Sequence, residues 1–354
     1  MNHTTPFTLW IHENVVAVIA ECVRAALSPG AQYTASTPGS TVSTRACGAM
    51  RSTRAASIDD LVRISRPRIE DALRMGTTTM EIKSGYGLDV ENELKILRAI
   101  YGVADSGAAV PSLMLTFLGA HAVPQEYRGR QDEYVDLVIT QMIPAVAALG
   151  YVSFVDVFCD QGYFTNDETA RICAAAATHE LRAKLHVDEL ADTDGAKLAA
   201  RIGALSADHL ERVNPLGIAA LGDSKTVATL LPGTAYFLGF PYPPARDLID
   251  RNCIVALATD FNPGSTPSYS MQLAISMACT QMKLTVEEAI TAATLNGAAA
   301  LGIGDRVGSI EPGKSADLIV CAVRDYREVG YWFGGNIVRD VVHGGHMPYA
   351  AEIW

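Results

Sequence analysis

The sequence has 354 residues, of which 49% are hydrophobic and 19% are charged, and this composition is typical of a globular protein with a large core. It carries 28 Lys and Arg against 39 Asp and Glu; the net charge of −11 argues against nucleic acid as a partner, because phosphate-backbone binding needs clustered basic side chains. A membrane partner is excluded as well, since the best apolar stretch, residues 142–158, is interrupted by Pro144, Gly150 and Asp156.

The first fifty residues form an atypical N-terminal segment. Residues 36–54 are crowded with Ser, Thr, Gly and Arg and show no clear period. Before them, only residues 15–27 have the pattern of a helix. We therefore expect residues 1–50 to pack irregularly.

From about residue 70 onward, short β-rich runs alternate with helical stretches. Asp89 is placed to cap a helix, and Thr165–Glu168 and Thr285–Glu288 are capping boxes that lead into Ala-rich helices. The alternation predicts parallel pairing, because each connection is long enough to carry a helix. The expected strands are residues 77–82, 112–117, 154–158, 183–186, 205–209, 226–231 and 254–259.

Polar residues stand where these strands end, and this favours a barrel over an open sheet. No glycine fingerprint for a dinucleotide and no Walker loop follows any of the strands. In a barrel the carboxyl ends of all strands converge on one mouth. The predicted fold class is therefore α/β, a (β/α)₈ TIM-type barrel over residues 51–300. The polar strand-end residues are Glu81, Lys83, His121, Asp160, His186, His209 and Asp260.

The pattern changes after about residue 300. Residues 308–320 have the pattern of a turn, a strand, a tight Pro-Gly turn and a second strand, and residues 337–342 form another strand before the turn at Gly344 and Gly345. Residues 301–354 are therefore predicted to form a small β-domain segment and a C-terminal tail.

Three strand ends carry residues that bind metals. His186 ends one strand, with Glu189 three residues further on, His209 ends the next strand, and Asp260 ends the last. Each alone has a structural explanation, because strand-end histidines are often satisfied by hydrogen bonds and an Asp before Asn-Pro-Gly initiates a turn. Taken together, they make a metal-assisted hydrolase the leading interpretation.

The segment 81–89 is the other dense motif. Gly85 and Gly87 allow a tight turn that projects Tyr86 into the mouth, where its hydroxyl can bind a polar substrate. A glycine-rich loop with an ordinary packing tyrosine is the competing interpretation. His121, a third strand-end imidazole, is as a lone residue more often a core hydrogen-bonding group.

These motifs resemble the imidazolonepropionases of the amidohydrolase superfamily. The similarity extends from about residue 51 to the C-terminal β-segment. It is carried by EIKSGYGLD at 81–89, TFLGAHAVP at 116–124, KLHVDEL at 184–190, LSADHL at 205–210 and ATDFNPGS at 258–265.

The resemblance implies hydrolysis of the ring amide of 4-imidazolone-5-propanoate to N-formimidoyl-L-glutamate in histidine degradation. His186 and Asp260 would be ligands of one zinc or iron ion. Asp260, His209 and Glu189 would be the catalytic groups. Substrate-binding residues would be Tyr86, His121 and Glu189, with Asn262, Gly264 and Ser265 lining the product side.

The sequence departs from the family at its front. The family has a His-x-His pair at the end of the first barrel strand, followed by an arginine for the substrate carboxylate. No His-x-His occurs in this sequence, and before the similarity begins the histidines are His3 and His12. The first barrel strand is therefore expected to be missing or replaced.

Two alternatives remain open: another cyclic-amide hydrolase or aminohydrolase of the same superfamily, and an inactive truncated homologue. The expected partner is a small-molecule substrate, and a homodimer is possible. Seven scattered cysteines without a CxxC pair, and a first segment without a basic leader, predict a cytoplasmic protein.

Overall fold

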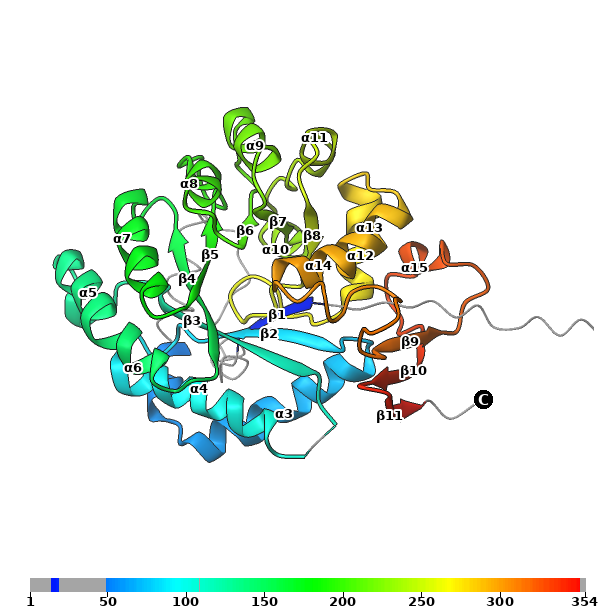
Figure 1. The fold of residues 1–354 in the computed structure, drawn as a ribbon, viewed down its shortest axis with the longest axis horizontal. Helices are drawn as coiled ribbons and strands as arrows, with labels where there is room; N and C mark the ends of the chain where they lie inside the picture. Colours follow the sequence, from blue (N-terminus) through cyan, green and yellow to red (C-terminus); the bar gives the residue numbers. More distant parts are fainter. Residues whose placement is uncertain (1–13, 19–48, 108, 351–354) are drawn as a thin grey trace, which may run out of the picture.

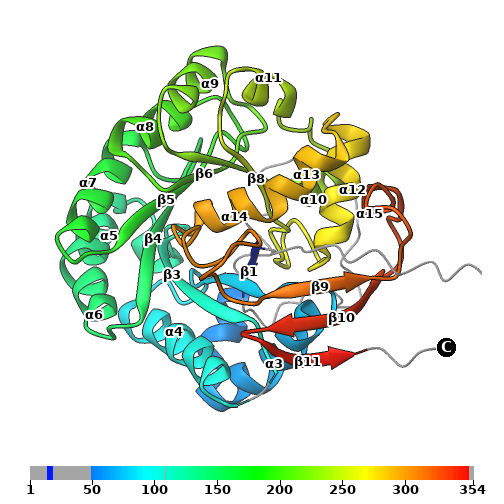
Figure 2. The same ribbon diagram turned by 45° about the vertical axis from the view of Figure 1, so that its right-hand side comes forward.

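Eight parallel strands form the main sheet, which curls around a central axis with helices on its outside (Figures 1 and 2). The computed structural model describes residues 14–18, 49–107 and 109–350. The strands follow chain order and each pairs with the next; among the described residues no ladder joins the last to the first. They are β1 Asn14–Val18, β2 Thr79–Lys83, β3 Ser112–Ala120, β4 Val152–Cys159, β5 Arg182–Val187, β6 Ser206–His209, β7 Val227–Leu230 and β8 Val255–Leu257.

The predicted barrel class is confirmed, and all seven predicted strands are present with small shifts at their ends. The helices and helical turns are α3 Ile58–Arg74, α4 Val90–Ala104, η1 Gln125–Tyr127, α5 Gln131–Leu137, η2 Val138–Met142, α6 Ile143–Ala147, α7 Asn166–Ala177, α8 Gly195–Ile202, α9 Pro215–Gly222, α10 Pro232–Leu238, α11 Ala245–Asp250, α12 Met271–Gln281, α13 Val286–Ala293, α14 Leu295–Ala300 and α15 Glu328–Tyr331. Residues 49–55 are also helical. No described helix is both long and apolar enough to cross a membrane.

The predicted helix caps are confirmed. The side chain of Asp89 accepts a hydrogen bond from the backbone N–H of Asn92 at the start of α4. The capping boxes led by Thr165 and Thr285 are both complete. Such caps satisfy backbone N–H groups that have no partner inside the helix, so each helix begins where the sequence places its cap.

The predicted helix at residues 15–27 is wrong at its start. Asn14–Val18 forms β1, which pairs in parallel with β2 so that Val16 lies opposite Glu81. Three of its five residues are valine, a β-branched type that favours strands. Pairing also satisfies backbone groups of β2 that would otherwise form a sheet edge. The first strand is thus replaced rather than missing. Residues 1–13 and 19–48, with His3 and His12, lie outside the described residues.

The C-terminal segment forms a three-stranded antiparallel sheet, in the order β11-β10-β9. Its strands are β9 Leu318–Cys321, β10 Val338–His343 and β11 His346–Ala350. The strand expected just after Gly308 does not form. Glu311 lies 3.2 Å from Lys314 across the Pro-Gly turn, so this stretch is a compact turn.

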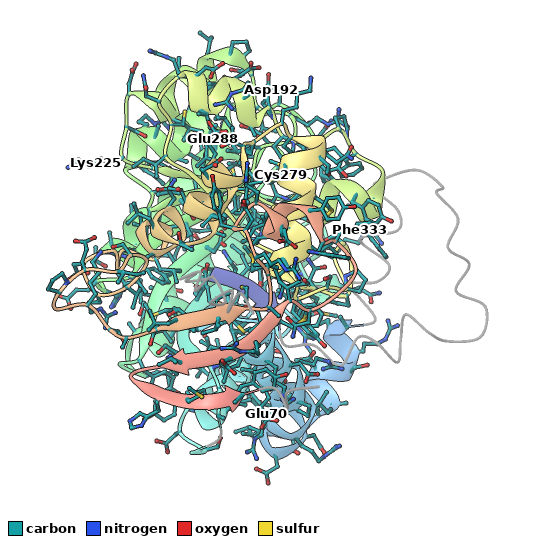
Figure 3. The ribbon with its side chains drawn as sticks, turned by 90° about the vertical axis from the view of Figure 1, so that its right-hand side faces the viewer. Glu70, Asp192, Lys225, Cys279, Glu288 and Phe333 are labelled. Atoms are coloured by element: carbon teal, nitrogen blue, oxygen red, sulfur yellow. The ribbon has the colours of Figure 1, made fainter. Side chains whose placement is uncertain are left out.

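This small sheet packs against the end of α3 (Figure 3, where Glu70 of α3 is labelled). A Cβ added at Gly76 would meet Val338 and Ile319 at 3.1 and 3.2 Å. The amide of Gln272 in α12 links the two parts, because it donates to the carbonyl of Met75 and to the side chain of Asn336. Two further hydrogen bonds complete this junction. Asn336 Nδ2 donates to the carbonyl of Arg74, and the N–H of Ile337 donates to Gln272 Oε1.

The interior of the main sheet holds a buried charge cluster of Glu81, Lys83, Asp156, Lys184 and Asp208. Lys83 Nζ lies 2.5 Å from Asp156, 3.0 Å from Asp208 and 3.3 Å from Glu81. Lys184 Nζ lies 2.8 Å from Glu81. Glu81 and Lys83 are both almost fully buried, so the expectation that they stand at the mouth is wrong. Their charges are instead neutralised by each other inside the barrel.

Candidate active site

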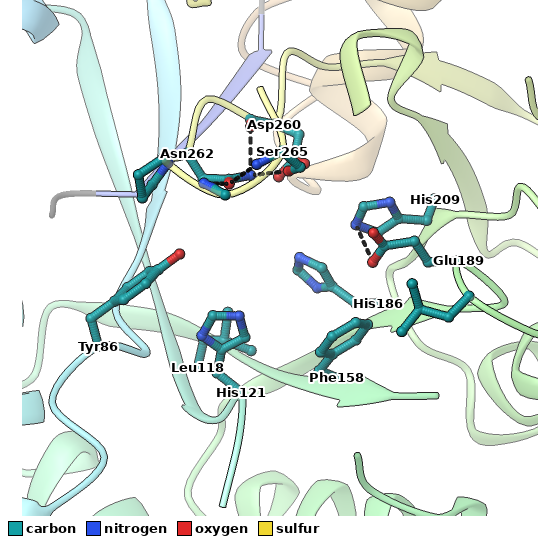
Figure 4. A pocket seen from close by; sticks show the side chains of 13 residues that line it. Tyr86, Leu118, His121, Phe158, His186, Glu189, His209, Asp260, Asn262 and Ser265 are labelled. Carbon is teal, nitrogen blue, oxygen red and sulfur yellow. Dashed lines mark hydrogen bonds and ion pairs between the residues drawn. The ribbon is translucent and has the colours of Figure 1, made fainter. Parts of the chain in front are cut away.

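One pocket at the carboxyl ends of the strands collects the predicted site residues (Figure 4). Its lining includes every residue for which the sequence predicts a catalytic, substrate-binding or metal-binding role: Tyr86, His121, His186, Glu189, His209, Asp260, Asn262, Gly264 and Ser265. Leu118, Phe158, Leu190 and Pro263 complete the lining. The parallel topology brings these residues together from segments far apart in the sequence.

The metal-ligand candidates lie close enough to share one ion. Ligand atoms of His186, His209 and Asp260 all lie within 4.8 Å of one another. Two imidazoles and a carboxylate are a donor set that suits zinc or iron. The sequence interpretation assigned His186 and Asp260 to the metal and His209 to catalysis, and the geometry brings all three to the same place.

His186 contacts Asp156 of the buried charge cluster, which lies deeper in the barrel. Its Nδ1 lies 2.9 Å from Asp156 Oδ2, and Asp156 comes from the neighbouring strand β4. Burial would raise the pKa of Asp156, but His186 and Lys83 outweigh it and hold the pKa well below its usual range. With Nδ1 facing an anionic carboxylate, Nε2 of His186 is the nitrogen left for a ligand in the pocket.

Asp260 is 4% exposed and held by two hydroxyl groups. Oδ2 accepts hydrogen bonds from Thr234 Oγ1 at 2.6 Å and Ser265 Oγ at 2.8 Å. Its φ of 54° is a left-handed conformation that non-glycine residues rarely adopt. Such strain is found where the surrounding structure fixes a functional side chain. Asp260 therefore faces the pocket rather than capping the turn that follows.

Asn262 stabilises the turn that follows Asp260. Its Oδ1 accepts from the N–H groups of Gly264 and Ser265 at 2.7 and 2.8 Å, and its Nδ2 donates to the carbonyl of Asp260. The turn thus places the backbone of Gly264 and the hydroxyl of Ser265 along one wall of the pocket.

Glu189 and His209 form a buried carboxylate–imidazole pair, drawn with a dashed line in Figure 4. Glu189 Oε2 lies 3.5 Å from His209 Nε2. Burial raises the pKa of Glu189 to about 8, although His209 opposes the shift. Burial would lower the pKa of His209, but Glu189 and Glu211 raise it well above its usual range. The pair therefore holds a proton at the pocket in neutral solution.

Asp160 and Asp188 shape the loop that carries Glu189. Asp160 accepts hydrogen bonds from the backbone N–H groups of residues 189–191, so it supports this loop and does not line the pocket as expected. Asp188 accepts from the N–H groups of Gly195 and Ala196 at the start of α8. Of the adjacent residues Asp188 and Glu189, only Glu189 lines the pocket.

Tyr86 lies at the pocket, with its hydroxyl directed inward in Figure 4, and its ring packs edge-on to His121 at 5.1 Å between ring centroids. Its loop is anchored by Glu93, which accepts from the N–H groups of Gly85, Gly87 and Leu88. A Cβ at Gly87 would come within 2.5 Å of the α4 backbone, so the glycine is required for this close approach.

Sequence reasoning missed the residues that hold the site without belonging to a motif. Asp156 lies inside the hydrophobic run of β4, whereas Glu93 lies in the first turn of α4 among polar and charged neighbours. For Asp156, a charged residue inside a hydrophobic run was the available signal, because burial of a charge needs a partner; for Glu93 the local sequence offered no such signal. Phe158, which stands between His121 and His186, was the other omission; it ends a predicted strand as they do.

Comparison with known proteins agrees with this geometry. Residues 69–347 match the Amidohydrolase family. Among solved structures, the fold is similar to 5-methylcytosine deaminase from Klebsiella pneumoniae, with a TM-score of 0.74, 15% identity, and coverage of 98% of this chain and 86% of the other. It is also similar to a mutant of the atrazine chlorohydrolase from Arthrobacter aurescens TC1 complexed with zinc, with a TM-score of 0.73, 16% identity, and coverage of 96% and 83%. The chain is a member of the amidohydrolase family.

Its curated relatives place it more narrowly. It is 45% identical over 300 residues to an imidazolonepropionase of Porphyromonas gingivalis, covering 85% of this chain and 70% of that protein. It is 46% identical over 297 residues to an imidazolonepropionase of Geobacillus kaustophilus, covering 84% and 70%. Within the amidohydrolases, the chain belongs to the imidazolonepropionases.

Proposed function

We propose that this protein hydrolyses the ring amide of 4-imidazolone-5-propanoate to give N-formimidoyl-L-glutamate. The observation that carries the proposal is the meeting of His186, Asp260 and the Glu189–His209 pair in one pocket. Ring-amide hydrolysis needs an activated water, a stabilised oxyanion and a proton for the leaving nitrogen. The pocket offers groups for all three.

A zinc or iron ion fits the residues present. His186 offers a nitrogen oriented by Asp156, and Asp260 offers a carboxylate oxygen at the same point. When bound there, such an ion would lower the pKa of a water molecule and polarise the ring carbonyl. We propose that His186 and Asp260 hold it.

Asp260 is proposed to remove a proton from the attacking water. Its carboxylate already accepts two hydroxyl hydrogen bonds on Oδ2, which fix its orientation toward the pocket. His209 is proposed to stabilise the developing oxyanion through a hydrogen bond. Glu189, whose pKa is raised to about 8, carries the proton that the departing ring nitrogen requires.

Tyr86 and His121 are proposed to contact the substrate, with Asn262, Gly264 and Ser265 lining the side where the product forms. All five line the pocket. His121 is positioned by its Nδ1, which lies 2.9 Å from the carbonyl of Gly85. Its other ring nitrogen therefore remains for the substrate. A cytoplasmic location and a homodimer remain predictions from the sequence.

The test is turnover of the imidazolone acid by the purified chain with added zinc or iron, followed by chromatographic identification of the product. N-formimidoyl-L-glutamate is expected; failure to open this ring, together with ammonia release from an amino-substituted heterocycle assayed in parallel, would indicate an aminohydrolase instead. Asp260→Ala should abolish turnover while circular dichroism stays unchanged. Asp223→Ala, at an exposed position, is the matched control. Unchanged turnover in Asp260→Ala would reduce Asp260 to a turn residue.

A further inference from the structure

Glu211 is a buried carboxylate that no step of the proposed reaction uses. It follows β6 by two residues, its side chain is 0% exposed, and neither carboxylate oxygen has a hydrogen-bond partner among the described residues. A carboxylate removed from water is costly unless a partner compensates it. Such a group needs an explanation.

The cationic partner within reach is His209. Glu211 Oε2 lies 3.6 Å from His209 Nδ1, and no other ion pair to Glu211 is found in the part of the chain that the structure describes. His209 Nε2, on the opposite side of the ring, lies 3.5 Å from Glu189. The imidazole is therefore held between a carboxylate behind it and the pocket in front of it.

The backbone between the two residues is strained in a way that produces this contact. His209 and Leu210 have φ values of 83° and 69°, two consecutive left-handed conformations in non-glycine residues. Each costs roughly 1–2 kcal/mol. The turn is held by the hydrogen bond from the N–H of Leu210 to the carbonyl of Val187, and by that from Arg212 to Asp188. Strain of this kind persists where neighbouring structure fixes a functional group.

His186 shows the same arrangement one strand earlier. Its Nδ1 faces Asp156 at 2.9 Å, as that of His209 faces Glu211. A carboxylate at one ring nitrogen fixes the tautomer and the direction of the other nitrogen. His186 and His209, two of the three imidazoles that line the pocket, thus each have a buried carboxylate next to Nδ1.

We propose that Glu211 is a positioning residue for His209, which it holds by Nδ1 so that Nε2 points at the reacting carbonyl. The proposal rests on the proposed function for its catalytic consequence, while the contact itself is independent of substrate. Glu211 acts on turnover through His209 and leaves metal binding to His186 and Asp260.

The contact is tested by NMR on the full chain labelled with ¹⁵N-histidine. A downfield, exchange-protected Nδ1–H signal that disappears in His209→Gln is expected to disappear in Glu211→Gln as well. The matched control is Asp317→Asn, which breaks a second buried carboxylate–imidazole pair, with His343 at 3.1 Å in the small sheet. The control should leave the His209 signal in place. Persistence of that signal in Glu211→Gln overturns the proposal, even for a chain without turnover.

The kinetic test is a double-mutant cycle. Glu211→Gln should lower kcat by about 10-fold to 100-fold, the usual effect of removing such a partner, with KM within about twofold and metal content unchanged. His209→Gln and the double variant should have equal kcat, because Glu211 acts only through His209. Additive losses, or a loss of metal in Glu211→Gln, contradict the proposal. Glu211→Met fills similar volume without polar atoms and replaces Glu211→Gln if that variant does not fold.

Discussion

Removal of the Lys83 ammonium tests the role of the buried charge cluster in stability. Lys83 has 0% exposure and contacts Asp156, Asp208 and Glu81, whereas Lys184 contacts Glu81 only among these carboxylates. In Lys83→Met, Asp156 and Asp208 therefore lose their ammonium partner while they stay buried. Breaking a buried pair in this way costs about 3–5 kcal/mol, a large part of a typical unfolding free energy of about 5–15 kcal/mol.

The unfolding free energies of wild type and Lys83→Met should depend on pH in different ways. The pKa of Asp208 is lowered to about 2, because Lys83 and Lys184 outweigh the effect of burial. A depressed folded-state pKa contributes stability that is present above the unfolded value of 3.8 and lost as pH falls toward 2. Without Lys83, less opposes the effect of burial, so the pKa values of Asp156 and Asp208 rise from their wild-type values and the destabilisation caused by Lys83→Met should shrink as pH falls.

Urea unfolding followed by circular dichroism at several pH values measures both effects. Lys225→Met, at an exposed lysine labelled in Figure 3, is the control and should change the unfolding free energy by less than about 0.5 kcal/mol. A penalty below about 1 kcal/mol for Lys83→Met, or one that does not shrink at acid pH, would refute the reasoning.

Four further predictions concern turnover and metal retention. Tyr86→Phe should raise KM about fivefold with kcat little changed, since one hydrogen bond of about 1 kcal/mol is lost; a change confined to kcat would contradict a binding role. Glu93→Gln should raise KM similarly, because the loop of Tyr86 loses its anchor. An unaltered KM would show that substrate binding by Tyr86 does not depend on Glu93. The acid form of Glu189, with a pKa of about 8, is present below that pH and lost above it, so wild-type turnover should fall as pH rises through 8 and Glu189→Gln should lack this limb. Because β1 contains no histidine, bound zinc should leave on dialysis and turnover should be weak; stoichiometric zinc with full activity would refute this.

Much of the site was predictable because parallel topology converts position along a strand into position in space. His186, His209 and Asp260 are far apart in sequence, yet each lies at or just after the carboxyl end of a strand of the same sheet. Once the strands were assigned, their carboxyl ends had to meet. The strand pattern alone therefore predicts that the three residues lie close together, and their ligand atoms do lie within 4.8 Å of one another.

Depth inside the barrel was not predictable from the same pattern. Glu81 and Lys83 stand two residues apart on β2, as residues on one face of a strand do. Nothing in the period of a strand distinguishes an inward residue at the mouth from one deeper in the barrel. Their partners Asp156, Lys184 and Asp208 come from three other strands, so the cluster is visible only after folding.

β1 escaped prediction for another reason. Its sequence NVVAV continues into further apolar residues, and a short apolar run has no period that distinguishes helix from strand. What decides the outcome is the free edge of β2, a long-range feature. The local sequence pattern does not distinguish a helix from a strand at this point, and pairing with β2 favours the strand.

The junction between the small sheet and α3 has a consequence for how the chain is made. The carbonyl groups at residues 74 and 75, where the first long helix of the barrel ends, receive their hydrogen bonds from Asn336 and Gln272, about 200 to 260 positions later. Contacts over such separations form slowly, and on a ribosome they wait until the later segment has emerged. During synthesis the apolar surface around Gly76 stays open to water. Packing of this helix end is therefore completed only after residue 336 has been synthesised.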